Sequence, residues 1–224
     1  MSDSYSILNA DTVKWLDSQA NNSLPNVLSG IPDMTEINYN VIEDYVKWCR
    51  RLLTTLFKKT NPYCYVILIQ TDRKIDGMWL DKSTMINNIA TDAGWNLLWH
   101  KIVLNRPVES ANLHRPTYSH MLCYGVHSAP GNGLPDVIEG SERLYNNGSS
   151  INAVKLALTF LSQKQHIWSK YNKKSHWDIV DPFLGRGTVM FYAVRDHGFR
   201  VLGIDIDPDQ VKFSKELMLK IKDQ

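Results

Sequence analysis

The chain has 224 residues, of which 43% are hydrophobic and 21% are charged, as in an ordinary globular protein with one well-formed core. The net charge of +2 is too small to indicate a polyanionic partner by itself, although a local basic patch would suffice for one. We find no secretory signal and no apolar stretch long enough to cross a bilayer, so no membrane partner is expected. The three cysteines form no metal-ligand pattern, and their odd number favours reduced thiols in an intracellular protein, cytoplasmic or nuclear.

Strand and helix signals alternate along the first half of the chain. β-branched or aromatic runs bounded by turn residues predict strands, and apolar residues one helical turn apart predict helices. The predicted strands are residues 5–8, 26–29, 63–69, 95–104 and 120–126. The predicted helices are residues 12–20, 36–59 and 82–93. The polar segment 70–77 is expected to be a loop, because it follows a buried strand directly.

The second half begins with the Gly- and Pro-punctuated segment 128–147, which is expected to be irregular. The elements expected after it are a helix over 151–165, a basic surface turn over 170–175, a strand near Val180, a helix over 188–197, a strand over 199–204 and a helix over 208–221. Seven strands that mostly alternate with helices predict a doubly wound, mainly parallel α/β sheet in a single domain of residues 1–224. The last two strands of the first half lack an intervening helix and are expected to pair as an antiparallel hairpin at one sheet edge.

The most informative stretch is Asp181-Pro182-Phe183-Leu184-Gly185-Arg186-Gly187-Thr188, which follows a short apolar strand. Pro182 cannot extend a strand ladder, so a turn is expected to begin there. Gly185 and Gly187 allow backbone conformations closed to other residues and let a ligand approach closely. A second apolar strand ends in Asp205, about twenty residues after the glycines, as expected for a carboxylate that binds ribose hydroxyls.

These residues resemble the Asp-Pro-Phe-x-Gly-x-Gly-Thr element of S-adenosylmethionine-dependent amino methyltransferases, which methylate nitrogen on nucleic-acid bases. The resemblance implies the Rossmann-like, seven-stranded mixed sheet of class I methyltransferases. It also implies the circularly permuted motif order, with a catalytic and target half in residues 1–127 before a cofactor-binding half in 148–224. The implied cofactor is S-adenosyl-L-methionine, and the residues implied to bind it are Asp181, Pro182, Phe183, Gly185, Gly187, Thr188, Asp205 and Asn152.

Asn152 enters through the segment 148–152, which opens a predicted helix where the family holds the methionine end of the cofactor. The alternative is that Ser149 or Ser150 simply caps this helix. Methyl transfer from a sulfonium requires mainly that the sulfur, the methyl group and the nucleophile be held in line, so neither a metal nor a covalent cysteine is expected.

The family's catalytic motif, Asp/Asn/Ser-Pro-Pro-aromatic, is altered here to Ser29-Gly30-Ile31-Pro32-Asp33-Met34. One proline remains and no aromatic stands at the expected position. Ser29, Pro32 and Asp33 are the candidate catalytic residues, and the carboxylate of Asp33 is suited to accept a proton from a ring N–H as a general base. The alternative for Asp33 is a cap of the following helix.

Candidate target-binding residues lie at strand ends that face the same crevice. They are Gln70, Asp72, His100, Arg115 and Tyr118. Arg115 suits a phosphate and Tyr118 suits a base. The alternative for His100 and His120 is a structural role on an apolar strand.

The sequence therefore predicts a methyltransferase that acts on a base nitrogen in nucleic acid. RNA, such as tRNA, is favoured over DNA, because no residues remain for a separate domain that would read a duplex, and a structured RNA presents single-stranded bases by shape. Two alternatives stay open. One is an inactive partner subunit with the same fold in a nucleic-acid-modifying complex, motivated by the altered catalytic motif. The other is a methyltransferase for a small molecule or a protein.

Overall fold

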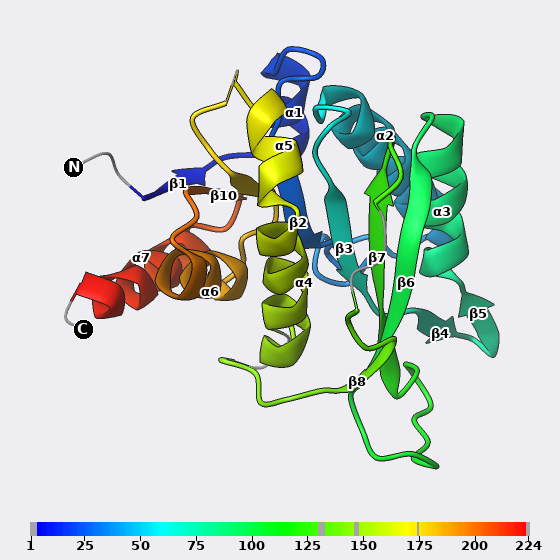
Figure 1. The fold of residues 1–224 in the computed structure, drawn as a ribbon. Helices are drawn as coiled ribbons and strands as arrows, with labels where there is room; N and C mark the ends of the chain where they lie inside the picture. The colour runs from blue at the N-terminus through cyan, green and yellow to red at the C-terminus, as the bar shows by residue number, and fades with distance from the viewer. Residues whose placement is uncertain (1–3, 130–132, 146–147, 174, 223–224) are drawn as a thin grey trace.

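The computed structural model describes residues 4–129, 133–145, 148–173 and 175–222, and its centre is one large mixed sheet (Figure 1). Eight described strands form this sheet in the order β1-β10-β9-β2-β3-β7-β6-β8. Their bounds are β1 (Tyr5–Asn9), β2 (Asn26–Gly30), β3 (Val66–Gln70), β6 (Asn96–Leu104), β7 (Tyr118–Gly125), β8 (Val137–Glu139), β9 (Ile179–Asp181) and β10 (Val201–Asp205). A separate hairpin consists of β4 (Arg73–Ile75) and β5 (Met78–Leu80).

Helices cover both faces of the sheet, so the predicted doubly wound α/β class is confirmed. The helices are α1 (Thr12–Ser18), α2 (Ile42–Lys59), α3 (Lys82–Asp92), α4 (Ile151–Gln163), α5 (Gln165–Tyr171), α6 (Thr188–His197) and α7 (Pro208–Lys222). Successive residues of β3 point to opposite faces: Val66 packs in the core beneath α1–α3, and Ile67 packs in the core beneath α4–α7. None of the helices in the described part of the chain has the length and apolar character needed to span a bilayer.

Strands from the two ends of the chain meet at the middle of the sheet. β2 pairs with β9 in parallel, as predicted, with Val27 opposite Val180. The buried amide of Asn26 reinforces this pairing: its nitrogen donates to the carbonyl of Asp178 (3.0 Å), and its oxygen accepts from the backbone of Tyr65 (2.9 Å). One side chain thus satisfies backbone groups on both neighbours of β2.

β1 lies beside β10, with Ser6 opposite Leu202. The N-terminal strand therefore belongs to the layer of the C-terminal elements rather than to the predicted target half. The predicted antiparallel pairing of the two strands without a helix between them is confirmed for β6 and β7. The sheet does not end there, because the short strand β8 adds in parallel outside β6. The predicted count of seven strands was therefore one too few.

The helix predicted over residues 36–59 begins only at Ile42. Residues 34–40 form a turn in which Asn38 has a φ of +57°, a left-handed conformation that cannot continue a right-handed helix. The loop predicted over residues 70–77 is instead the start of the β4–β5 hairpin, whose turn residues Asp76 and Gly77 have φ values of +49° and +77°. Asp-Gly is the typical sequence of such a turn, so this signal was present in the sequence.

Two differences remain in the second half. β8 lies within the segment 128–147 that was expected to be irregular, of which residues 130–132 and 146–147 are outside the described residues. α5 replaces the first part of the turn predicted over 170–175, of which residue 174 is not described. Trp168 explains α5: its buried indole donates to the carbonyl of Leu161 and fixes the short helix against α4.

Gly203 on β10 provides a test of how closely the sheet and the glycine turn pack. A Cβ at this position would lie 2.6 Å from Cδ1 of Leu184 and 2.7 Å from Cε of Met190. We expect Gly203→Ala to lower the free energy of unfolding by roughly 1–3 kcal/mol, as overpacking does. Chemical denaturation measures this cost. The double variant Gly203→Ala/Leu184→Ala should be less destabilised than the sum of the two single variants, since the truncation removes the contact with Leu184 and leaves only that with Met190. Strict additivity would contradict this packing.

Candidate active site

A cavity of about 970 Å³ opens at the C-terminal ends of β9, β2 and β3. Strand order reverses between β9 and β2, and ligands of open α/β sheets bind outside such a point. The cavity is lined on one side by the turn after β9 and on the other by the segment after β2. The structure thus brings together the preserved motif and the altered one, which lie far apart in the sequence.

The turn after β9 has the geometry predicted for its glycines. Gly185 and Gly187 have φ values of +52° and +89°, in the left-handed region. The hydroxyl of Ser214 on α7 donates to the carbonyl of Gly185 (2.8 Å) and holds the turn in place. Gly187 is the N-cap of α6 and offers no side-chain cap; the N–H group of Thr188, the first of α6, donates instead to the hydroxyl of Tyr145 (3.3 Å).

Asp205 fastens the end of β10 to the same turn. One carboxylate oxygen accepts the backbone N–H of Gly185 (2.7 Å), and the other accepts that of Asp207 (2.9 Å). Burial raises the pKa of Asp205 above its ordinary value. Each oxygen keeps a second lone pair, so this carboxylate can still accept hydrogen bonds from a ligand in the cavity that it lines.

Asp181, the last residue of β9, is buried and faces the cavity. The hydroxyl of Ser29 at the end of β2 donates to its Oδ1 (2.7 Å). Burial raises the pKa of Asp181 to about 7, because the charged form is poorly solvated there. Ser29 does not line the cavity; its role in the structure is to hold this carboxyl group.

The N-terminus of α4 also reaches the cavity, through Ser149 and Ser150. The hydroxyl of Ser150 makes no cap; it accepts the backbone N–H of Ser141 (3.1 Å) instead, so the alternative of a capping Ser150 hydroxyl is wrong. Asn152 is not part of the lining, and its amide donates to the carbonyl of Glu139 (3.1 Å). Sequence reasoning missed Tyr145, whose hydroxyl lies 2.7 Å from that of Thr188 and lines the cavity.

Asp33 lies on the opposite wall and binds three cationic side chains. Its Oδ2 lies 3.0 Å from Arg115 and 3.3 Å from Arg73, and its Oδ1 lies 3.2 Å from Lys82. Asp33 is buried, and it does not cap α2, which begins nine residues later at Ile42. The capping alternative is therefore wrong. Sequence reasoning did not foresee Arg73 or Lys82, because neither stands in a motif.

An aromatic wall lies between the two motifs and was also missed. Trp48 on α2 lies 6.1 Å from Phe183 and 6.3 Å from Tyr39, measured between ring centroids. All three side chains line the cavity beside Pro32. Apolar ring faces are therefore present next to the altered motif, although the motif itself contains no aromatic residue.

Of the predicted target-binding residues, the structure brings Gln70 and Arg115 to the cavity but not Asp72, His100 or Tyr118. Asp72 accepts from Nε2 of His120 (3.2 Å) and from the indole of Trp79 (2.9 Å). Burial acts to raise the pKa of Asp72, but these hydrogen bonds outweigh it and lower the pKa below its ordinary value. Nδ1 of His120 in turn lies 2.7 Å from Nε2 of His100. Asp72, His120 and His100 therefore form hydrogen bonds with one another on the face of β7 that is turned away from the cavity.

The cavity is electrically polarised along its length. Carboxylates prevail at the end at β9 and β10, where Asp11, Asp181, Asp205 and Asp207 lie together with Arg186. Cations prevail at the opposite end, where Lys82, Arg106, Arg115 and Arg143 lie. Such an arrangement suits a ligand with cationic and hydroxyl groups at one end and an anionic ligand at the other. Among the described residues, no cluster of three or more side chains could hold a metal ion.

Solved structures share this fold, and two of the three proteins reported below are DNA methylases by name. TTHA0409, a candidate DNA modification methylase from Thermus thermophilus, matches in its complex with S-adenosyl-L-methionine with a TM-score of 0.70 at 16% identity, over 97% of this chain and 94% of that one. The cytosine-N4-specific PvuII DNA methyltransferase matches with a TM-score of 0.68 at 15% identity, over 98% and 90%. The complex of M1.HpyAVI with SAM matches with a TM-score of 0.57 at 12% identity, over 96% and 99%.

No family model matches the sequence, and no curated protein matches it significantly. At identities this low the likeness concerns the fold. It confirms the predicted Rossmann-like mixed sheet, which this chain shares with methyltransferases over nearly its whole length.

The buried carboxyl of Asp181 makes a prediction for stability without ligand. A pKa raised from an ordinary value near 4 to about 7 means that the folded protein keeps this proton where the unfolded chain loses it. The contribution is therefore fully present below pH 4 and is lost as the pH rises towards 7. We expect Asp181→Asn to flatten the fall in unfolding free energy over this window, as measured by urea denaturation. Asp205→Asn is the control, because the pKa of Asp205 is also raised. If Asp181→Asn and wild type lost stability identically with pH, the raised pKa of Asp181 would be contradicted.

Proposed function

We propose that this protein is an S-adenosyl-L-methionine-dependent methyltransferase that transfers a methyl group to a base nitrogen in nucleic acid. The observation that carries the proposal is the cavity in which the glycine turn and Asp205 face a cationic wall around Asp33. The cofactor half is assigned to residues 148–224 and the target half to residues 1–127, in the permuted order. Two N-terminal features also lie on the cofactor side. Asp11 lines the cavity there, and β1 pairs with β10.

The residues present fit this cofactor. Gly185 has open space where a Cβ would stand, so a ligand can approach its backbone. Asp205 has lone pairs for two ribose hydroxyls, and the acidic lining favours the cationic sulfonium. Thr188, Tyr145 and the start of α4 offer hydroxyl and N–H groups at the other side of the turn. The matched structures of TTHA0409 and M1.HpyAVI contain this cofactor, which supports the proposal.

When bound, the cofactor supplies an activated methyl group, so the protein's task is to align the accepting nitrogen with it. Trp48 and Phe183 offer ring faces for a base, and Gln70 offers amide hydrogen bonds at the end of β3. The accepting nitrogen would take the methyl group that the cofactor supplies and would release its proton to solvent. The carboxyl group of Asp181, whose pKa is raised to about 7, lines the same cavity as these side chains.

DNA is the first substrate to test. The preference for RNA, inferred from the absence of a recognition domain, has no support among the matched proteins, of which two are named DNA methylases. Those names belong to the matched proteins, and the substrate of this chain is for experiment to decide. The direct test is transfer of a labelled methyl group to DNA and to RNA in parallel, followed by identification of the methylated nucleoside. Label in neither nucleic acid would overturn the proposal.

The second candidate is a partner subunit with this fold and without catalytic activity. The altered motif favours it, because residues 29–34 lack the second proline and the aromatic residue of the family, and Asp33 is paired with cations. Calorimetry with the cofactor separates the two. Failure of the isolated chain to bind S-adenosyl-L-methionine would favour the subunit over the enzyme.

Cofactor affinity should depend on Asp205. Hydrogen bonds to a charged acceptor are worth about 1.5–3 kcal/mol, so we expect Asp205→Asn to raise the Kd for S-adenosyl-L-methionine about 10- to 100-fold in isothermal titration calorimetry. Asp17→Asn is the control, since Asp17 is an exposed carboxylate of α1 outside the cavity lining. Equal affinities for the two variants would place the ribose elsewhere.

A further inference from the structure

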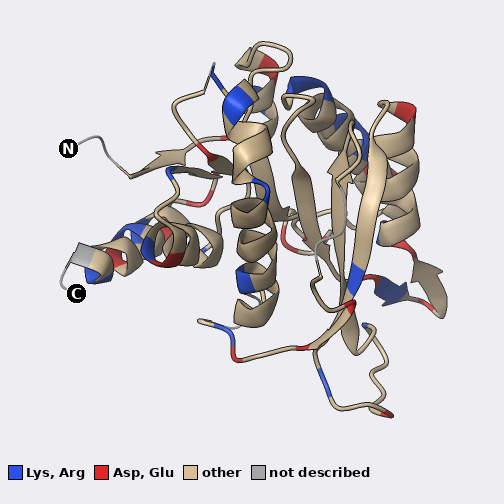
Figure 2. Ribbon diagram, viewed as in Figure 1, with Lys and Arg blue, Asp and Glu red and all other residues tan. Residues whose placement is uncertain are grey.

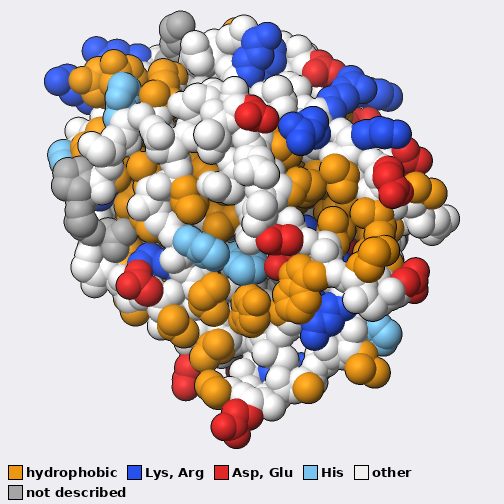
Figure 3. Space-filling view, turned by 90° about the vertical axis from the view of Figure 1, so that its right-hand side faces the viewer, with side chains coloured by type: hydrophobic (Ala, Val, Ile, Leu, Met, Phe, Trp, Pro, Cys, Tyr) orange, Lys and Arg blue, Asp and Glu red, His pale blue; other side chains and the backbone are white. Residues whose placement is uncertain are grey.

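A second hollow, of about 490 Å³, lies outside the main cavity between the β4–β5 hairpin and the loop of residues 105–117. Its lining combines an aromatic ring, aliphatic side chains, basic groups and one carboxylate. The residues are Lys74, Asp76, Gly77, Met78, Trp79, Leu113 and His114. Figure 3, which shows the face that carries this hairpin, has hydrophobic side chains interspersed with His and with charged side chains of both signs.

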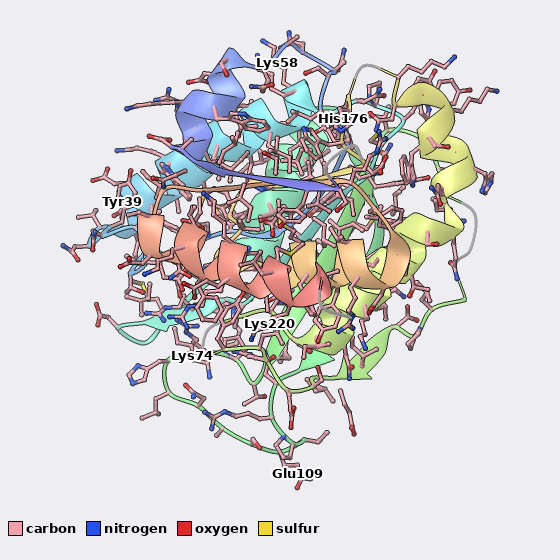
Figure 4. All side chains as sticks on the ribbon, turned by 90° about the vertical axis from the view of Figure 1, so that its left-hand side faces the viewer. Tyr39, Lys58, Lys74, Glu109, His176 and Lys220 are labelled. Atoms are coloured by element: carbon pink, nitrogen blue, oxygen red, sulfur yellow. The ribbon has the colours of Figure 1, made fainter. Side chains whose placement is uncertain are left out.

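The hairpin and the loop form one protrusion. The backbone N–H of Lys74 donates to the carbonyl of His114 (3.0 Å), and its ammonium donates to the carbonyl of Asn112 (2.9 Å). The same ammonium lies 5.2 Å from the centre of the Trp79 ring. Figure 4 shows Lys74 and Glu109 at one end of the molecule, opposite Lys58 and His176.

Asp33 joins this protrusion to the main cavity. Arg73 belongs to the hairpin and Arg115 belongs to the loop, and both guanidinium groups bind Oδ2 of Asp33. Lys82 at the start of α3 binds the other oxygen. One buried carboxylate thus fixes the two parts of the protrusion relative to each other and to the cavity wall. In this arrangement both oxygens of Asp33 are engaged, which suits a positioning residue better than a general base.

The protrusion is exposed, apolar and basic at once. Leu113 is 86% exposed and Met78 is 64% exposed, an unusual situation for large apolar side chains. Residues 73–80 and 105–117 contain four Lys and Arg against two Asp and Glu, and two of the four, Arg73 and Arg115, are paired with Asp33. Figure 2 shows this basic character on β4. A polyanion with apolar ring faces matches such a surface.

We propose that this hollow binds a nucleotide next to the target nucleotide, with its base against Trp79, Met78 and Leu113 and its phosphate near Lys74 and His114. The inference rests on the proposed function and adds a second contact site on the substrate. With this second site the chain contacts a nucleic-acid strand at two places without a separate recognition domain. It also assigns Asp33 to positioning, since its ion pairs set the distance between the two sites.

Binding of fluorescein-labelled DNA oligonucleotides, single-stranded and duplex, tests the hollow by anisotropy with the full chain. We expect Leu113→Ser and Trp79→Ser each to raise the Kd about tenfold, and Trp79→Phe to retain most of the affinity because a ring remains. Lys74→Gln should weaken binding and reduce the slope of log Kd against log salt by about 1. The matched controls are Leu219→Ser and Lys220→Gln on α7, on the opposite side of the fold in Figure 1. They should bind like wild type.

The outcomes separate the inference from the proposed function. If wild type binds and methylates but the protrusion variants behave like the α7 controls, the hollow is not a nucleotide site and the proposed function stands. The hollow is equally ruled out as a nucleotide site if Leu113→Ser changes only the oligomeric state in light scattering, since the surface would then bind a second copy of the chain. If wild type binds no nucleic acid, both proposals fall.

The role of Asp33 has its own readout. We expect Asp33→Asn to raise the KM for an oligonucleotide about tenfold or more, because the hairpin and the loop lose their common anchor, while kcat at saturation and the pH profile stay close to those of wild type. A general base would show the reverse: a large loss in kcat, a changed pH profile and a retained KM. Circular dichroism of the variant checks that the chain is folded.

Discussion

The hydrogen bond between the hydroxyl of Ser29 and the carboxyl of Asp181 is the contact on which the cavity depends. It joins the ends of β2 and β9, 152 residues apart in the sequence, at the point where strand order reverses. The glycine turn begins beyond one partner and the altered catalytic motif begins beyond the other. Because both groups are buried, the bond is unscreened by water and fixes where the two motifs face each other.

Fold class and the cofactor side of the cavity were predictable because their signals are local. A strand, two glycines at positive φ, a helix and an acid follow one another over residues 179–205, so Gly185 and Asp205 could be placed from spacing alone. The β4–β5 turn was equally local, and its Asp-Gly signal was overlooked. The helix start at Ile42, by contrast, depended on the left-handed conformation of Asn38, which no residue pattern indicated.

The target side was less predictable because its contacts are not local. Arg73, Lys82 and Arg115 come from a strand, a helix and a loop, and they converge on Asp33 only through the packing of the sheet. Asp72 and His120 show the converse. Asp72 follows β3 and His120 lies in β7, but neither lines the cavity, and they bind each other instead. In β7, His120 points to the face opposite that of its cavity-lining neighbour Ser119. The position of a residue at the end of a strand predicts the edge of the sheet at which it lies. The face of the sheet to which its side chain points depends on the register of the strand.

The placement of β1 has a consequence for how the chain is made. Of the described strands, β1 is synthesised before the others, but its partner β10 is synthesised nearly 200 residues later. The edge of the sheet beside Asp205 therefore closes only after the other described strands have been made, and so non-local a pairing is expected to form slowly. Until then β1 lacks its partner, and an unpaired strand favours aggregation of a folding intermediate.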